Sequence, residues 1–337
     1  MQATTLKLID EYDDRNTKIC HAVRWDASDE YLLFLKQIGL RWVSLSADGL
    51  QDLSVKSIRK VQQRFRSFGL EVYCGQHFAY RSLEIQLGRP GRDRDIETYC
   101  TFIRSIGKLG IPVSVYDFHP ANTYTTANVA SRRGYITREF NEQDFRSKVE
   151  KQRFEREYSA EEMWDYYTYF VEAVLPVAEE ANVKIGLHPD DPPLSFMNGV
   201  AKLFVNYDGY HRAEEIAGGS KNWGILLCVG TWAEGGNRMG KNVLEMIKDF
   251  AGRKRIFQVH FRNVSSPLPV FHETFLDDGY LDMYQVMKAF REVRYDGSML
   301  PDHIPYLVGD DEHRRAGLAY SVAYMRSLLR RANEEVG

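Results

Sequence analysis

Short apolar runs alternate along the chain with longer segments in which apolar residues recur at helical spacing. Eight runs are interpreted as strands: residues 18–25, 42–46, 71–75, 112–118, 183–189, 223–229, 255–263 and 297–303. Most are continuously apolar, as expected of parallel strands buried on both faces. Between them, residues 55–69 show helical spacing and end on glycine. Residues 160–183 follow Ser159, a predicted N-cap with Glu162 three residues later.

Eight strand–helix units predict a (β/α)8 barrel built from the whole chain, residues 1–337. A doubly wound open sheet is the alternative, but no glycine-rich phosphate loop follows the first strand. Two segments are longer than the connections of a minimal (β/α)8 barrel. Residues 119–158 are polar and charged and are interpreted as a long loop, either a lid over the barrel mouth or a surface excursion. Residues 264–281 form a second insertion.

Composition narrows the class of protein. The chain is 44% hydrophobic and 27% charged, as in soluble globular enzymes. Its net charge of −3 gives no basic surface for nucleic acid. The N-terminal residues are too polar for a signal peptide, and no apolar stretch is long enough to span a membrane. Four cysteines without paired spacing are interpreted as reduced thiols, which favours the cytoplasm.

Chemically active side chains gather where the predicted strands end. In a (β/α)8 barrel the active site lies at the carboxyl ends of the strands. Six of the nine histidines fall in or just after a predicted strand: His21, His77, His119, His188, His260 and His303. Asp117 and Cys228 also stand at strand ends. We therefore expect one site at the barrel mouth.

Four consecutive strands end in His188, Cys228, His260 and Asp302. Imidazole, thiolate and carboxylate together suit a divalent transition metal better than Mg²⁺, which prefers oxygen ligands. The softness of a thiolate favours Zn²⁺, Fe²⁺ or Mn²⁺, and taken alone leans towards Zn²⁺. Each residue also has a structural interpretation: an apolar cysteine filler, a core histidine or a helix-capping aspartate. Their occurrence on four adjacent strands favours a metal site.

Asp190 and Asp191 follow His188 directly and precede two prolines. Aspartate in such a turn commonly bonds the local backbone, and we favour this role for at least one of the two. The alternative is that one of them orients the imidazole of His188 by accepting its free N–H.

Several segments resemble the mannonate dehydratases, metal-dependent enzymes of hexuronate breakdown. The segment "LPVAEEANVKIGLHPDDPP" carries the strongest similarity, followed in order by "LLCVGT", "VHFRNV", "FHETFLDDGYLDMYQVMKAF" and "PDH". The likeness is densest in residues 174–303. "VYDFHP" is a weaker match, with Asp117 where the family commonly has asparagine.

This resemblance implies a (β/α)8 dehydratase that converts a sugar acid, D-mannonate or a related hexonate, to a 2-keto-3-deoxy acid. The four predicted ligands match the family's metal ligands, which would hold Mn²⁺ or Fe²⁺. His303 matches an acid/base histidine. Arg262 matches an arginine that would clamp the substrate carboxylate or, alternatively, form a structural salt bridge. The further substrate-binding candidates are Asn263, Asp117, His119, His77 and Arg24. We expect a homo-oligomer acting on a small molecule.

Three departures bear on the substrate. Ile304 and Pro305 follow the "PDH" motif, where the family has glycine and a polar or basic residue. Leu318 follows Gly317 where the family has a catalytic tyrosine, so Tyr306, His313 or Tyr320 would have to replace it. The lid segment is shorter than in many members. A keto-sugar isomerase or epimerase on the same barrel, or a silent sugar-acid-binding homologue, therefore stays open as an alternative.

Overall fold

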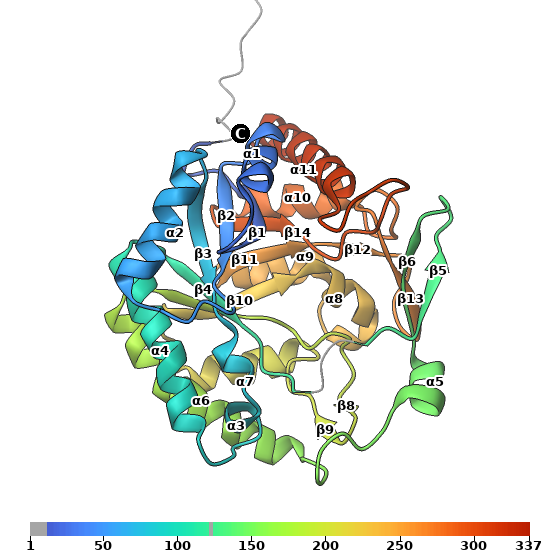
Figure 1. The fold of residues 1–337 in the computed structure, drawn as a ribbon. Coiled ribbons are helices and arrows are strands. Elements are labelled where there is room, and N and C mark those ends of the chain that lie inside the picture. Colours follow the sequence, from blue (N-terminus) through green and yellow to red (C-terminus); the bar gives the residue numbers. More distant parts are fainter. Residues whose placement is uncertain (1–11, 121–123) are drawn as a thin grey trace, which may run out of the picture.

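The computed structural model describes residues 12–120 and 124–337, and eight strands close into a parallel barrel (Figure 1). Around the barrel the order is β1, β2, β3, β4, β7, β10, β11, β14, with β14 pairing back to β1. Their bounds are β1 Lys18–Arg24, β2 Trp42–Ser46, β3 Glu71–Gln76, β4 Val113–Tyr116, β7 Lys184–Leu187, β10 Trp223–Cys228, β11 Ile256–Phe261 and β14 Ser298–Pro301. Each overlaps one predicted run. The predicted barrel is confirmed, and the open sheet is excluded.

Helices follow the strands and cover the outside of the barrel (Figure 1). They are α1 Asp29–Gln37, α2 Val55–Ser67, α3 Leu83–Gln86, α4 Arg92–Lys108, α5 Glu142–Asp144, α6 Ala160–Glu180, α7 Tyr207–Ile216, α8 Val229–Gly235, α9 Val243–Met246, α10 Met283–Glu292 and α11 Arg315–Val336. Short 3-10 turns lie at Phe78–Arg81 (η1) and Gly236–Met239 (η3), and π turns at Phe145–Val149 (η2) and Ile247–Ala251 (η4). As predicted, Ser159 and Glu162 form a capping box at the start of α6.

The strands supply the centre of the hydrophobic core. Every residue of β4 and of β10 is buried, as the continuous apolar runs predict for parallel strands. The four cysteines are buried and free, which agrees with the interpretation as reduced thiols. None of the helices in the described part of the chain is long and apolar enough to cross a membrane.

The two insertions meet in one small sheet, which corrects the prediction of a long loop over residues 119–158. The first insertion contains β5 Ala127–Ala130 and β6 Ile136–Asn141, and the second contributes β12 Asn263–Val264 and β13 Val270–Thr274. They form a four-stranded sheet in the order β12, β13, β6, β5, which stands to one side of the barrel (Figure 1). Phe271 of β13 pairs with Phe140 of β6, so residues far apart in the sequence share this sheet. A hairpin of β8 Phe196–Met197 and β9 Val200–Ala201 follows β7.

Candidate active site

A cavity of about 240 Å³ opens at the carboxyl ends of the barrel strands. Its walls include four histidines, two of the predicted metal ligands among them, and three aspartates from different strand ends. The titratable lining residues are Arg81, Tyr116, Asp117, His119, His188, Asp191, His260, Asp302 and His303. The cavity therefore lies at the carboxyl ends of the strands, where we expected the site from the barrel fold.

Three of the four predicted metal ligands form a compact group. One donor atom each of His188, Cys228 and His260 lies within 4.8 Å of the others. Cys228 and His260 are register partners on neighbouring parallel strands, so their side chains stand side by side. His188 donates its Nδ1–H to the carbonyl oxygen of Pro189 (2.6 Å), because that oxygen can only accept. This bond leaves Nε2 of His188 as the ligand atom.

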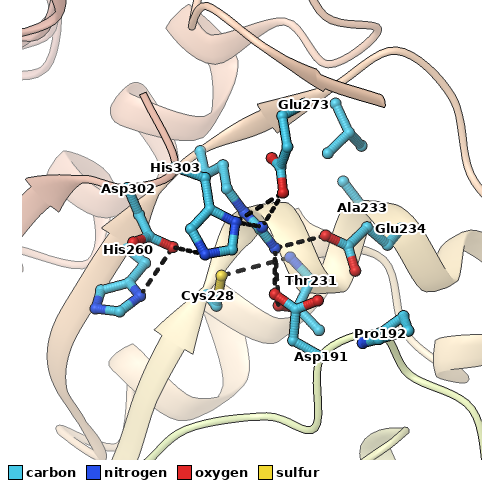
Figure 2. Close-up of polar contacts among 12 residues, drawn as sticks. Asp191, Pro192, Cys228, Thr231, Ala233, Glu234, His260, Glu273, Asp302 and His303 are labelled. Atoms are coloured by element: carbon cyan, nitrogen blue, oxygen red, sulfur yellow. Dashed lines mark hydrogen bonds and ion pairs between the residues drawn. The ribbon is translucent and has the colours of Figure 1, made fainter. Parts of the chain in front are cut away.

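Asp302 lies beside this group rather than inside it. Its Oδ2 is 3.3 Å from Nδ1 of His260 and 3.6 Å from Nε2 of His303 (Figure 2). Burial alone would raise the pKa of Asp302, but His303 and His260 hold it well below its usual value. The fourth predicted donor is thus an ionised carboxylate next to the three-residue group.

The donor set fits a divalent transition metal. Burial alone would raise the pKa of Cys228, but Arg262 and hydrogen bonds from His188 and His260 lower it well below its usual value. Burial alone would lower the pKa of His260, but Asp302 and Cys228 raise it to about 10. A thiolate and a carboxylate in one enclosed site thus attract positive charge. Nδ1 of His260 is buried and faces the carboxylate of Asp302 at 3.3 Å.

Replacing Cys228 by serine is expected to lower the bound metal clearly below that of the unaltered chain, because a hydroxyl is a harder and weaker ligand than a thiolate. Elemental analysis of the purified variant measures this. Cys100→Ser is the matched control, since Cys100 is also buried and free but lies on α4, outside the cavity. Equal metal content in the two variants would remove Cys228 from the site.

Arg262 lies beneath the cavity, and this position does not fit its predicted role as a carboxylate clamp. The side chain is fully buried and is not among the cavity-lining residues. It donates to Asp191 (3.0 Å), Glu234 (2.6 Å) and Glu273 (2.7 Å), the carboxylates grouped in Figure 2. The structure therefore favours the alternative, a structural salt bridge, here with three partners.

A glycine makes room for this arginine. A Cβ atom added at Gly230 would lie 1.9 Å from Nε of Arg262, so any side chain there would displace the guanidinium. Gly230 is the glycine of the "LLCVGT" motif, two residues after Cys228. The motif thus supplies both the thiolate and the space for the arginine behind it.

The two aspartates after His188 have different roles. Asp190 accepts a hydrogen bond from the backbone N–H of Phe204 (2.8 Å), which belongs to a later loop, so it joins two loops and does not bond the local backbone of its own turn as predicted. Asp191 lines the cavity and accepts from Arg262 and from the hydroxyl of Thr231 (3.3 Å). Neither accepts the N–H of His188, which goes to Pro189, so the alternative prediction of an orienting carboxylate is wrong.

His303 reaches the cavity because its own backbone turns. His303 itself makes the turn after β14, since its φ of 48° lies in the left-handed region. Its Nδ1 lies 2.7 Å from Oε1 of Glu273 and also contacts Arg262 (Figure 2). These two contacts occupy Nδ1, which leaves Nε2 for chemistry. The structure thus brings His303 to the metal group, as the motif implied.

The other three acid/base candidates lie outside the cavity. Tyr306 is 45% exposed and stacks under the guanidinium of Arg314. His313 is exposed and packs on Tyr31 (ring centroids 4.6 Å apart), and the hydroxyl of Tyr320 bonds Asp277 at the surface. None of the three lines the cavity, so this geometry does not fit the predicted replacement of the tyrosine lost at Leu318.

Of the remaining substrate-binding candidates, Asp117 and His119 line the cavity, whereas His77, Arg24 and Asn263 do not. His77 caps η1 by accepting from the backbone of Ala79, and Arg24 pairs with Asp26 on the surface. Asn263 is fully buried and holds the second insertion through the carbonyl oxygens of Leu276 and Leu281. These three side chains are occupied by structural bonds.

Arg81 is a cavity residue that the sequence analysis missed. It follows β3 in η1, and its Nε donates to Oδ2 of the buried Asp117 (2.7 Å). Nη2 donates to the same oxygen, so three of the five guanidinium N–H groups are left for a ligand. Arg81 is the only arginine or lysine among the cavity-lining residues of the described chain. Its position at the end of a barrel strand was the available signal.

A closed (β/α)8 barrel with a histidine–cysteine–histidine group at its mouth defines a TIM-barrel enzyme with a candidate metal centre, of the architecture also seen in xylose isomerase-like proteins. The comparisons with known proteins then identify the family. Residues 141–334 match the model of the D-mannonate dehydratase (UxuA) family, and the chain belongs to this family of hydro-lyases.

Individual relatives agree. The chain is 30% identical over 261 residues to mannonate dehydratase 2 of Halalkalibacterium halodurans, covering 70% of this chain and 74% of that one. It superposes on the crystal structure of a mannonate dehydratase from Streptococcus suis with a TM-score of 0.83 and 26% identity, covering 96% of both chains. A D-psicose 3-epimerase from Clostridium cellulolyticum shares the fold alone, with a TM-score of 0.62, 14% identity and coverage of 93% and 99%.

Proposed function

We propose that the protein is a metal-dependent dehydratase of a hexonate, D-mannonate or a close relative, and releases a 2-keto-3-deoxy acid and water. The observation that carries the proposal is that His188, His260, His303 and Arg81 line one cavity, and that Cys228 forms one compact group with the first two. His188, Cys228 and His260 would hold Mn²⁺ or Fe²⁺, with Asp302 next to them. When bound, that ion would hold the substrate and acidify its C2 hydrogen.

The chain's own residues supply the other requirements of a dehydration. Arg81 offers three free N–H groups to the substrate carboxylate and is held in place by Asp117. His303 can transfer a proton through Nε2, because Glu273 holds the ring in place at Nδ1.

The cellular setting follows from the same features. Four buried free cysteines, one of them in the metal group, suit a reducing compartment. We therefore place the enzyme in the cytoplasm, in the breakdown of hexuronate-derived acids.

The proposal is tested with a panel of hexonates and hexuronates, incubated with the protein and Mn²⁺ and assayed for 2-keto-3-deoxy acids. We expect at least one hexonate to be converted, no conversion of the matching neutral aldose, and loss of activity after chelation with recovery on adding Mn²⁺. Formation of an isomer instead of a 2-keto acid would establish an isomerase or epimerase. Metal-dependent binding of every acid without turnover would establish a silent homologue.

A further inference from the structure

The proposed dehydration needs two proton transfers, and the cavity shows only one group assigned to them. One group must take the C2 proton, and another must protonate the hydroxyl that leaves C3. His303 can serve one of these steps. The position of the family's second group is Leu318, which is fully buried on α11 and cannot transfer a proton.

The contacts of the titratable residues in the cavity wall exclude most of them as the second proton-transfer group. His188, His260 and Asp302 belong to the candidate metal centre, and Asp191 is bound to Arg262. The hydroxyl of Tyr116 bonds Tyr167 (3.1 Å) and Trp223 (3.0 Å). Arginine does not lose its proton in proteins, which excludes Arg81. Apart from His303, this leaves Asp117 and His119.

Between these two, the contacts favour His119 as the group that moves a proton. Oδ2 of Asp117 is occupied by Arg81, and Oδ1 faces Nε2 of His119 at 3.6 Å. The guanidinium of Arg81, bound to Oδ2, stabilises the ionised form of this carboxylate, so Asp117 is a poor base. It is well placed instead to stabilise the imidazolium that forms when Nε2 of His119 takes up a proton.

The imidazole of His119 has no other partner. The side chain is 9% exposed, and its Nδ1 is buried without a hydrogen bond in the described chain. Nε2 is therefore the nitrogen that reaches the cavity. Burial, outweighing the opposite effect of Asp117, lowers the pKa of His119, with Lys202 and Arg81 adding to this and Asp190 opposing it. A neutral imidazole accepts a proton.

The barrel order places His119 opposite His303. In the closed order β1, β2, β3, β4, β7, β10, β11, β14, strands β4 and β14 are four places apart and so lie across the barrel from each other. His119 follows β4, and His303 follows β14. The metal group occupies the strands between them on one side, β7, β10 and β11. A substrate held by that group thus has one histidine on each flank.

We propose that His119 is the second proton-transfer residue of this enzyme and accepts the C2 proton of the sugar acid across the cavity from His303. This inference rests on the proposed dehydratase function. The C2–H bond breaks and its proton goes to Nε2 of His119, while its electron pair forms the C2=C3 bond. The C3–O bond breaks, and the hydroxyl leaves as water with a proton from His303. Tautomerisation of the enol then transfers the O2 proton to His303 and a proton from His119 to C3, which restores both residues.

The test compares His119→Gln with the unaltered chain on the hexonate that the panel identifies. Glutamine keeps a polar group near the position of Nε2 but cannot accept the proton. We expect unchanged metal content, substrate affinity within a few-fold and turnover lowered by about 100-fold, the usual scale for a lost general base. With substrate deuterated at C2, the kinetic isotope effect should be larger in the variant, because C2–H cleavage becomes the slow step.

His211→Gln is the matched control, since His211 is exposed on α7, outside the cavity, and pairs with Glu215 of the same helix. If His119→Gln does not fold, Asp117→Asn takes its place, and full turnover in that variant would overturn the inference. Turnover of His119→Gln within threefold of the unaltered chain, or a loss explained entirely by weaker substrate binding, would do the same. A wild-type chain that dehydrates no hexonate would remove both proposals, whereas an active wild type with an unimpaired variant would remove His119 alone.

Discussion

Replacement of Arg262 by methionine is expected to lower the free energy of unfolding by roughly 3–5 kcal/mol, the scale for removing one partner of a buried ion pair. The guanidinium is fully buried and is the shared partner of Asp191, Glu234 and Glu273. Without it, carboxylates from three different segments would stay together in a low dielectric with no positive charge between them. Urea unfolding monitored by circular dichroism measures the change.

Two further variants make this result specific. Arg104→Met removes an arginine of similar size from an exposed ion pair with Glu97 on α4 and should change stability by only about 0.5 kcal/mol or less. Arg262→Lys keeps the charge but loses the forked geometry, so we expect an intermediate loss. A methionine variant as stable as the Arg104 control would show that the buried cluster does not depend on this cation.

Replacement of His303 by asparagine is expected to leave the metal in place and to lower turnover by about 100-fold or more. Asparagine can still donate a hydrogen bond from its side-chain amide to Glu273, but it has no nitrogen that takes up and releases a proton at neutral pH. Metal analysis and steady-state kinetics on the same preparation separate the two effects. His272→Asn, on β13 with its ring outside the cavity, is the control. A His303 variant that keeps both metal and turnover would exclude it as a proton carrier.

The barrel could be predicted from the sequence because parallel strands buried on both faces are continuous apolar runs, as β10 shows. β5 and β6 could not, because they are short and only partly buried, and β6 pairs with β13 from a distant part of the chain. Such strands resemble polar loops until their partner is known. For the same reason, the sequence gives no indication that the two insertions form one sheet.

The rule that barrel active sites lie at the carboxyl ends of the strands identified the metal group and His303. It could not distinguish side chains that face the cavity from side chains buried behind it. Arg262 directly follows β11, yet it points into a layer beneath the cavity, because carboxylates from three other segments converge there. Those partners come from the loop after β7, from α8 and from β13, and no local pattern links them. Arg81 lies at the cavity but was missed, because it belongs to a four-residue turn that carries no recognisable motif. Only the structure shows that Asp117 fixes it in the cavity.

The small sheet formed by the two insertions has a consequence for the order in which the protein folds. The chain between β6 and β13 contains the barrel strands β7, β10 and β11, so this contact closes a long loop and is entropically costly to form early. β13 also carries Glu273, which orients His303 and binds Arg262. The proton-transfer site is therefore complete only once this long-range contact has formed, and during refolding enzymatic activity should return no earlier than the native far-ultraviolet signal.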